Sequence, residues 1–168
     1  ADQVAQLAGV TPLGLQPMRR SMARLPAPDG HDLSKWPMIF GPGESWYAKP
    51  DAGGWIVSPA EEDPIEPMDA WPEDMVLAEG LDRYQHYVTS RVIRLETSWA
   101  GLRTFSPDRS LVLGEDPDVS DFFWCAGQGG YGIQSAPAAS TCLADLVAGR
   151  TPTLGADTVQ ALSPSRFR

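Results

Sequence analysis

Residues 121–134 read Asp121-Phe122-Phe123-Trp124-Cys125-Ala126-Gly127-Gln128-Gly129-Gly130-Tyr131-Gly132-Ile133-Gln134. The nearly continuous apolar run at 121–126 predicts a strand buried on both faces of an α/β sheet. The glycines that follow predict a tight turn, and residues 133–147, closed by Gly149, predict a helix. Pro137 falls in the first turn of this helix, where proline is tolerated.

The glycine turn at 127–132 has the G-x-G-x-x-G spacing of a dinucleotide-binding turn. A complete βαβ unit also needs a second parallel strand after the helix, with an acidic residue about 20 positions on. The chain continues instead with Arg150-Thr151-Pro152-Thr153-Leu154-Gly155, so the fingerprint is incomplete. The turn still directs backbone N–H groups and the positive end of a helix dipole at one point, where a flat or anionic group could approach. A turn that serves only close helix–strand packing is the alternative.

Upstream of this turn, short apolar stretches alternate with turn sequences. We predict strands at 19–25, 36–40, 45–49 and 55–58, and a spacing of about ten residues favours an antiparallel meander. Residues 91–95 and 97–104 resemble one long strand, and 111–113 a short one. An amphipathic helix is predicted from Glu73 to about Val88, after an acidic, exposed loop at 61–72. The predicted fold class is therefore mixed α/β (α+β), with an antiparallel sheet from 19–59 and 91–104 crossed by this helix. The tail from Arg150 shows only weak periodicity.

Length, composition and charge exclude several classes of function. A chain of 168 residues allows one domain, or one and part of another. Its net charge of −9 argues against a nucleic-acid partner, and no apolar run approaches the ~20 residues that cross a bilayer. Two cysteines and two histidines predict neither a disulfide framework nor a metal site. We expect a soluble protein of a reducing compartment. Because Ala1 falls inside predicted helical turns that end at Gly9, we also expect a piece of a longer protein.

An ordered set of motifs resembles the C-terminal half of the D-amino-acid oxidase-like FAD-dependent oxidoreductases, and most of all bacterial D-amino acid and D-arginine dehydrogenases. The motifs follow one another along nearly the whole chain: Gln16-Pro17-Met18-Arg19-Arg20-Ser21, Tyr47-Ala48-Lys49-Pro50-Asp51, Trp99-Ala100-Gly101-Leu102-Arg103-Thr104, Leu111-Val112-Leu113-Gly114, the 123–134 stretch with Ser135-Ala136-Pro137, and Leu162-Ser163-Pro164-Ser165-Arg166.

The resemblance implies a two-domain flavoprotein. Residues 1–98 would be part of the substrate-binding domain, 99–150 the strand and helix that return to the FAD-binding domain, and 151–168 a C-terminal tail. The region that grips the ADP half of FAD lies outside the matched motifs. We therefore expect an N-terminal FAD-binding half as partner, no retention of FAD by this chain alone, and self-association through its exposed domain face. The resemblance also implies a cytoplasmic protein, with a peripheral association with the inner membrane through an electron acceptor as the alternative.

The implied reaction oxidises the Cα–N bond of a D-amino acid by hydride transfer to flavin, followed by hydrolysis of the imine. Arg103 matches the carboxylate clamp, because a guanidinium offers a planar, permanently charged donor pair. Arg20 matches a second carboxylate contact, although Arg19 is adjacent and a solvated pair is the alternative. Tyr47 matches a carboxylate-binding hydroxyl, with a buried core aromatic as the alternative.

The resemblance places the flavin at the start of the predicted helix, at Gly129, Gly130, Tyr131, Gly132, Ile133 and Gln134. Backbone N–H groups there would stabilise negative charge on the reduced flavin. Gly130 would also offer its carbonyl to the substrate amine. His31 and His86 are predicted to be exposed, Cys125 to be a buried strand residue and Cys142 a helix residue, none with a catalytic role.

Two other functions stay open. The same fold could oxidise glycine, sarcosine or proline, since Arg103 would hold any α-carboxylate. A non-catalytic binding module that lacks the nucleotide half is the alternative from another class.

Overall fold

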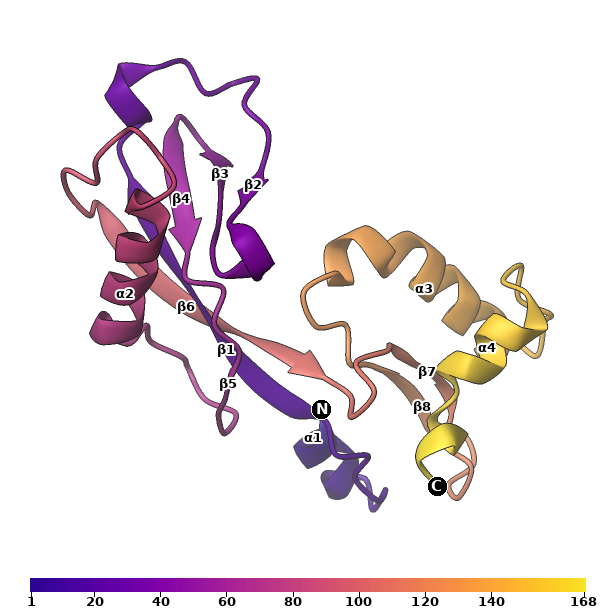
Figure 1. Ribbon diagram of the computed structural model, residues 1–168. Coiled ribbons are helices and arrows are strands. Elements are labelled where there is room, and N and C mark those ends of the chain that lie inside the picture. The colour runs from indigo at the N-terminus through magenta and orange to yellow at the C-terminus, as the bar shows by residue number, and fades with distance from the viewer. The chain divides into compact units, whose positions relative to one another are not determined.

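The computed structural model describes residues 1–168, and its fold is mixed α/β (Figure 1). The helices are α1 (Asp2–Leu7), α2 (Asp74–Gln85), α3 (Gly132–Val147) and α4 (Ala156–Leu162), with 3-10 turns η1 (Pro28–Gly30), η2 (Pro42–Glu44) and η3 (Pro164–Phe167). The strands are β1 (Gln16–Leu25), β2 (Ile39–Phe40), β3 (Tyr47–Asp51), β4 (Gly54–Ser58), β5 (Asp63–Pro64), β6 (Thr97–Phe105), β7 (Val112–Glu115) and β8 (Phe123–Ala126). None of the helices has the length and apolarity needed to span a bilayer.

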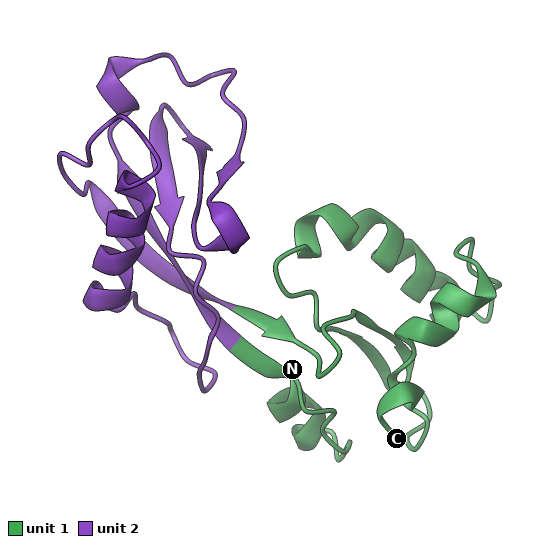
Figure 2. Ribbon diagram, in the orientation of Figure 1, with its two compact units in different colours: residues 1–17, 103–168 green, residues 18–102 purple.

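The chain forms two compact units, shown in different colours in Figure 2. Unit 1 comprises residues 1–17 and 103–168, and unit 2 comprises residues 18–102. The chain passes from one unit to the other within β1 and again within β6. The expected division at residues 98 and 150 into domains of different function stays a prediction, because compactness alone does not assign a role.

Unit 2 is built on the six-stranded sheet, in the order β2-β3-β4-β1-β5 with β6 also paired to β1. The predicted antiparallel meander is confirmed for β2, β3 and β4, which pair in sequence order. Strand β1 then joins antiparallel to β4, with Ala23 opposite Val57. The 61–72 segment is less loop-like than expected, because β5 pairs with β1 through Asp63 opposite Arg19.

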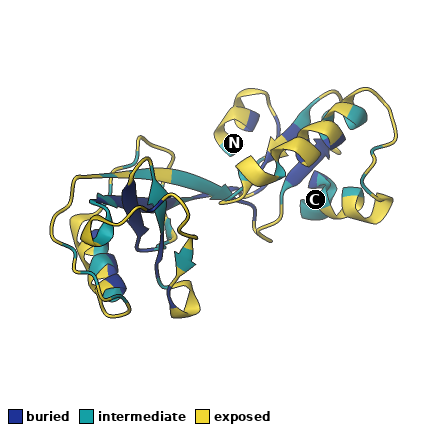
Figure 3. Ribbon diagram, turned by 90° about the horizontal axis from the view of Figure 1, so that it is seen from above, coloured by how far each residue is buried: buried dark blue, intermediate teal, exposed yellow.

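Helix α2 covers one face of this sheet. Its Leu77 and Tyr84 pack with the small and aromatic residues of that face, and Trp55 Nε1 donates a buried hydrogen bond to the Tyr84 hydroxyl at 2.9 Å. Strand side chains alternate between faces, so only alternate residues reach this core. Figure 3 shows the buried residues concentrated on the strands. The cluster comprises Ala23, Leu25, Leu33, Trp46, Ala48, Trp55, Val57, Leu77 and Tyr84.

The contact of α2 with β4 yields a stability prediction at Gly80. A Cβ at this buried position would lie 2.7 Å from the Pro59 Cα, closer than real Cβ contacts allow. We expect Gly80→Ala to lower the free energy of unfolding by about 1–2 kcal/mol, since overpacking outweighs the ~1 kcal/mol gain in helix propensity. Gly101→Ala is the matched control, because nothing lies within 4 Å of its Cβ position. Urea unfolding of both variants tests this, and an equal effect at the two sites would contradict it.

Unit 1 contains the antiparallel pair β7–β8, against which α3 packs. Its core joins α1 and the following segment to this pair through Ala5, Val10, Leu13, Leu15, Val112, Trp124 and Ala126. The N-terminal helix expected before Gly9 is confirmed as α1. Its Asp2 carboxylate accepts backbone hydrogen bonds from Leu13, Gly14 and Leu15, which fixes the segment that leads into β1.

The prediction of a doubly buried strand at 121–126 was wrong. Strand β8 alternates, with Trp124 and Ala126 buried and Cys125 exposed, and it pairs antiparallel with β7 rather than entering a parallel sheet. Phe122 extends the apolar run although it lies before the strand. Its ring packs edge-on against the Trp124 ring, with 5.4 Å between the ring centroids. Cys142 lies in α3, as expected, whereas Cys125, expected to be buried, is exposed.

Three other segments differ from the expected elements. Only Ile39–Phe40 of the 36–40 stretch is a strand, since Trp36 instead packs edge-on against Trp55. Residues 91–95 are irregular, and strand pairing begins after the Glu96 N–H donates to the Arg24 carbonyl. The tail forms α4 and η3. The Ser163 hydroxyl caps the start of η3. These elements were not predicted because the apolar periodicity of the tail is weak.

Candidate functional site

The guanidinium of Arg103 lies over the glycine turn in unit 1. A Cβ at Gly130 would lie 2.8 Å from Arg103 Nη1, so the absence of a side chain at this position makes room for the guanidinium. Arg103 is in β6, half-buried, whereas Gly130 is exposed. The structure thus brings together the two residues that the sequence proposed for the carboxylate and the amine of one substrate.

The end of β6 holds the turn in place. The Gly129 N–H donates to the Thr104 carbonyl at 2.9 Å, and Phe105 and Gln128 form an antiparallel bridge. Gly129 has φ +52°, and a Cβ there would lie 2.7 Å from Phe105 Cδ1, so backbone conformation and space both require glycine. The residues that fix the turn therefore follow Arg103 directly in sequence.

Helix α3 begins immediately after this turn. Its N-cap Tyr131 makes no capping hydrogen bond through its side chain, so the N–H groups of the first turn have no partner within the helix. The Tyr131 hydroxyl donates instead to the Arg109 carbonyl at 2.9 Å. Ile133 is 96% exposed and Gln134 is exposed, so the first turn of α3 is open to a ligand in this chain. This arrangement suits partial negative charge on a bound group.

In unit 2, Arg20 and Tyr47 lie together. The Arg20 Cζ is 5.7 Å from the centroid of the Tyr47 ring, and both residues are buried. The Tyr47 hydroxyl donates to Met22 Sδ at 3.5 Å, and its ring contacts Phe40 at 6.1 Å between centroids. Tyr47 belongs to β3. The core cluster under α2 includes Trp46 and Ala48, which flank Tyr47 in sequence, but not Tyr47 itself. Tyr47 is therefore on the other face of the sheet.

The neighbouring arginines of β1 have different partners. Arg19 Nη2 contacts Asp63 at 3.1 Å and its Nη1 contacts Glu73 at 3.0 Å. Burial would lower the pKa of the Arg19 guanidinium, but these two carboxylates raise it above the ordinary value. Arg19 thus ties β1 to β5 and to the start of α2. Of the two candidates at this position, Arg20 is the one beside Tyr47.

Sequence reasoning treated Glu61, Glu62 and Asp63 as a solvated loop, and this interpretation missed their pairing with β1, although Glu62 is exposed. Glu61 accepts the Ser21 N–H, Glu62 pairs with Arg20, and Asp63 pairs with Arg19. Three acidic residues in a row, facing an Arg-Arg-Ser triplet, are the signal that could have identified this pairing. The other candidates behave as expected, since His31 and His86 are both exposed.

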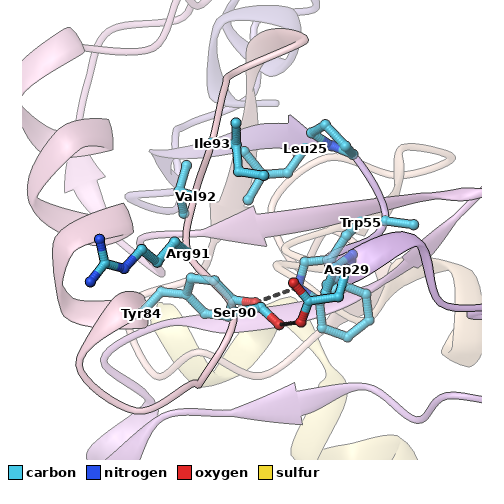
Figure 4. A pocket seen from close by; sticks show the side chains of 11 residues that line it. Leu25, Asp29, Trp55, Tyr84, Ser90, Arg91, Val92 and Ile93 are labelled. Atoms are coloured by element: carbon cyan, nitrogen blue, oxygen red, sulfur yellow. Dashed lines mark hydrogen bonds between the residues drawn. The ribbon is translucent and has the colours of Figure 1, made fainter.

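A small pocket in unit 2 lies apart from the candidate residues. Figure 4 shows it bordered by Leu25, Val92 and Ile93, with the Trp55–Tyr84 hydrogen bond beneath and a Ser90–Asp29 hydrogen bond of 2.6 Å at its edge. Trp55 thus bonds to Tyr84, and Ser90 to Asp29. Neither Arg20 nor Tyr47 lines it.

Comparison with known families identifies the class of protein to which this fold belongs. The model of the DAO family, FAD dependent oxidoreductase, matches residues 1–146. The chain belongs to this family.

Curated relatives and solved structures agree with this assignment. FAD-dependent oxidoreductase domain-containing protein 1 of Bos taurus is 26% identical over 170 positions, which cover 88% of this chain and 33% of the relative. Its Xenopus laevis counterpart is 26% identical over 172 positions, with 88% and 32% covered. The chain thus spans about a third of the length of the curated relatives that it matches.

Among solved structures, glycine oxidase from Geobacillus kaustophilus superposes with a TM-score of 0.78 at 22% identity, covering 99% of this chain and 43% of that one. L-proline dehydrogenase from P. horikoshii superposes with 0.73 at 22% identity, covering 97% and 43%. L-amino acid deaminase from Proteus vulgaris gives 0.73 at 20% identity, covering 96% and 39%. These similarities establish the fold, and the resemblance inferred from sequence is confirmed at the level of the family.

Proposed function

We propose that the complete protein is an FAD-dependent amino acid oxidoreductase, and that this chain supplies its carboxylate clamp and the helix start that faces the flavin. The observation that carries the proposal is the Arg103 guanidinium over Gly130, beside the uncapped first turn of α3. A fixed positive charge next to a side-chain-free turn suits a small carboxylate held against a flat ring.

The residues of the turn fit a flavin in one respect that the structure displays. Gly130 is exposed and has no side chain to cover its backbone, whereas a Cβ at Gly132 would come within 3.2 Å of the Gln128 side chain. Residues 129–134 would hold the flavin, with the N–H groups of α3 stabilising negative charge on it. A bound FAD would supply the hydride acceptor for oxidation of the substrate amine to an imine, which water would hydrolyse.

The chain's own residues bind and orient the substrate. Arg103 would donate two parallel N–H bonds to the substrate carboxylate, and Arg20 with the Tyr47 hydroxyl would add further donors. Gly130 would accept a hydrogen bond from the substrate amine through its carbonyl. An amine held by a neutral acceptor keeps its lone pair available once deprotonated, which favours imine formation.

The finer proposal is a D-amino acid substrate, because the sequence motifs most resemble D-amino acid dehydrogenases. Glycine, sarcosine or proline is an equally supported substrate, since a guanidinium clamp accepts any α-carboxylate and the structural neighbours include glycine oxidase and L-proline dehydrogenase. A steady-state assay of the complete flavoprotein with D-arginine, D-alanine, glycine, sarcosine and L-proline, with an artificial electron acceptor, separates these substrates. Absence of turnover with all five would favour the non-catalytic binding module.

We further predict that the 168-residue chain alone does not retain FAD. The strand before the glycine turn is antiparallel and no strand follows α3, so the described residues contain no βαβ unit for the pyrophosphate. Ile133 at 96% and Leu7 at 89% exposure leave apolar side chains of unit 1 uncovered, which favours self-association. The visible spectrum and the mass of the purified chain test this prediction. A monomer with a stoichiometric flavin band would contradict it.

A further inference from the structure

A carboxylate of the protein already occupies Arg20. Arg20 Nη2 donates to Glu62 Oε1 at 2.9 Å, although Arg20 is the residue that the proposed function assigns to the substrate carboxylate. We propose that Glu62 is a specificity-determining residue whose carboxylate competes with that of the substrate for Arg20. This inference rests on the proposed function.

The position of Arg20 does not depend on Glu62. Its side chain is only 9% exposed, it leaves the middle of β1, and the Tyr47 ring lies 5.7 Å from its Cζ. A guanidinium confined by burial and by an aromatic neighbour stays in place when one carboxylate replaces another. Exchange of carboxylates on Arg20 therefore requires no movement of the sheet.

The donors of Arg20 are incompletely used. Its Nε is buried and has no hydrogen-bond partner, which is costly for a charged donor. A guanidinium binds a carboxylate best through two parallel N–H bonds, and Nε with one Nη forms such a pair. An incoming carboxylate that engages both atoms gains a bond that Nε lacks beside Glu62.

Glu62 can leave more easily than the other partners of β1. Its side chain is 34% exposed, and it precedes the two-residue strand β5, so water can solvate a displaced carboxylate. Asp63, by contrast, is fixed by main-chain pairing opposite Arg19, which a second carboxylate from Glu73 also holds. The pair on Arg19 is therefore structural, whereas the pair on Arg20 is exchangeable.

Competition of this kind acts only on molecules that carry a carboxylate. A molecule without one cannot replace Glu62 on Arg20, so the ion pair persists and the charge stays neutralised. A molecule with one must displace Glu62, and its affinity is lowered by the strength of that pair. Removal of the Glu62 charge should therefore tighten the binding of carboxylates.

The test is Glu62→Gln in the complete flavoprotein, with Glu66→Gln as an exposed control on the same segment. We expect the KM for the amino acid and the dissociation constant of propionate, a carboxylate without an amine, to fall about fivefold with kcat unchanged. The control should match wild type. Propionate binding is measured by titration calorimetry, so this readout does not depend on turnover. Glu62→Ala should act in the same direction, and thermal unfolding verifies that the variants are folded.

A double-mutant cycle separates direct competition from a general change in charge. In an Arg20→Met background, Glu62→Gln should leave propionate binding unchanged, since no guanidinium remains to compete for. A tightening that persists in this background would overturn the inference, as would a rise or no change in KM on the wild-type background. Failure of the wild-type enzyme to oxidise any amino acid would instead overturn the proposed function, and the propionate titration would still report on Glu62.

Discussion

Arg103→Ala in the complete flavoprotein is expected to raise the KM for the amino acid substrate about 100-fold or more, while flavin content stays near that of wild type. Each charge-assisted hydrogen bond to the carboxylate contributes about 1.5–3 kcal/mol, and every 1.4 kcal/mol is a factor of ten in affinity. Two such bonds are lost when the guanidinium is removed. Flavin content should not follow, because the main-chain contacts of the turn with Thr104 and Phe105 are kept in the variant.

Two further variants define what this result means. Arg103→Lys keeps the charge but not the planar pair of donors, so its KM should lie between those of wild type and Arg103→Ala. Arg150→Ala removes an exposed arginine paired with Asp145 beyond the far end of α3, and it should leave KM unchanged. Steady-state kinetics and the ratio of flavin to protein absorbance measure these effects. An unchanged KM in Arg103→Ala would remove the clamp assignment, and loss of flavin would make Arg103 a residue that holds the cofactor.

Sequence predicted the fold best where local chemistry and tertiary packing agree. The α2 and α3 helices follow from apolar periodicity, and β3 and β4 follow from a turn at 51–54 in which Gly53 has φ +78°. The burial of strand β8 was predicted wrongly because its run of apolar side chains is compatible with two structures. A strand buried on both faces and an alternating strand preceded by a packed Phe122 have the same composition. Only the pairing partner, β7, distinguishes them, and pairing is not a local property.

The candidate site was predictable in its members but not in their partners. Arg103 and Gly130 were proposed from separate motifs, and the structure brings them together because β6 ends beside the glycine turn. Arg19 and Arg20 could not be separated by sequence, since adjacent strand residues face opposite sides and the burial of each side was unknown. The role of Glu62 depends on the register of β5 against β1, and the acidic triplet at 61–63 indicates a pairing with the arginines but does not fix that register.

Asp116→Ala is expected to lower the free energy of unfolding by about 3–5 kcal/mol, because it removes one partner of a buried ion pair. The Asp116 side chain is fully buried, and it accepts hydrogen bonds from Trp124 Nε1 at 2.9 Å and Arg168 Nη2 at 3.0 Å. It also accepts the backbone N–H groups of Asp118 and Val119. The carboxylate thereby joins the end of the chain to the β7–β8 pair, and its loss leaves the indole N–H without its partner.

The same site predicts a dependence on pH with a definite sign. Burial would raise the pKa of Asp116, but the hydrogen bonds from Trp124 and the backbone, together with Arg168, hold it below the ordinary value. A carboxyl whose pKa is lower in the folded than in the unfolded state stabilises the fold above the unfolded pKa, and this contribution is lost as the pH falls through the folded value. Asp116→Ala should therefore lose less stability than wild type on acidification.

Asp118→Ala is the matched control for this site. Asp118 also pairs with Arg168, through Nε at 3.2 Å, but its side chain is 64% exposed. An exposed pair contributes about 0–1 kcal/mol, so this variant should unfold near the wild-type denaturant midpoint at every pH. Urea unfolding of wild type and both variants at pH 7 and at about pH 3, below the ordinary carboxyl pKa, makes the comparison. Equal losses at the two positions would mean that Arg168 is held by net charge alone, and that burial of Asp116 does not strengthen its contacts.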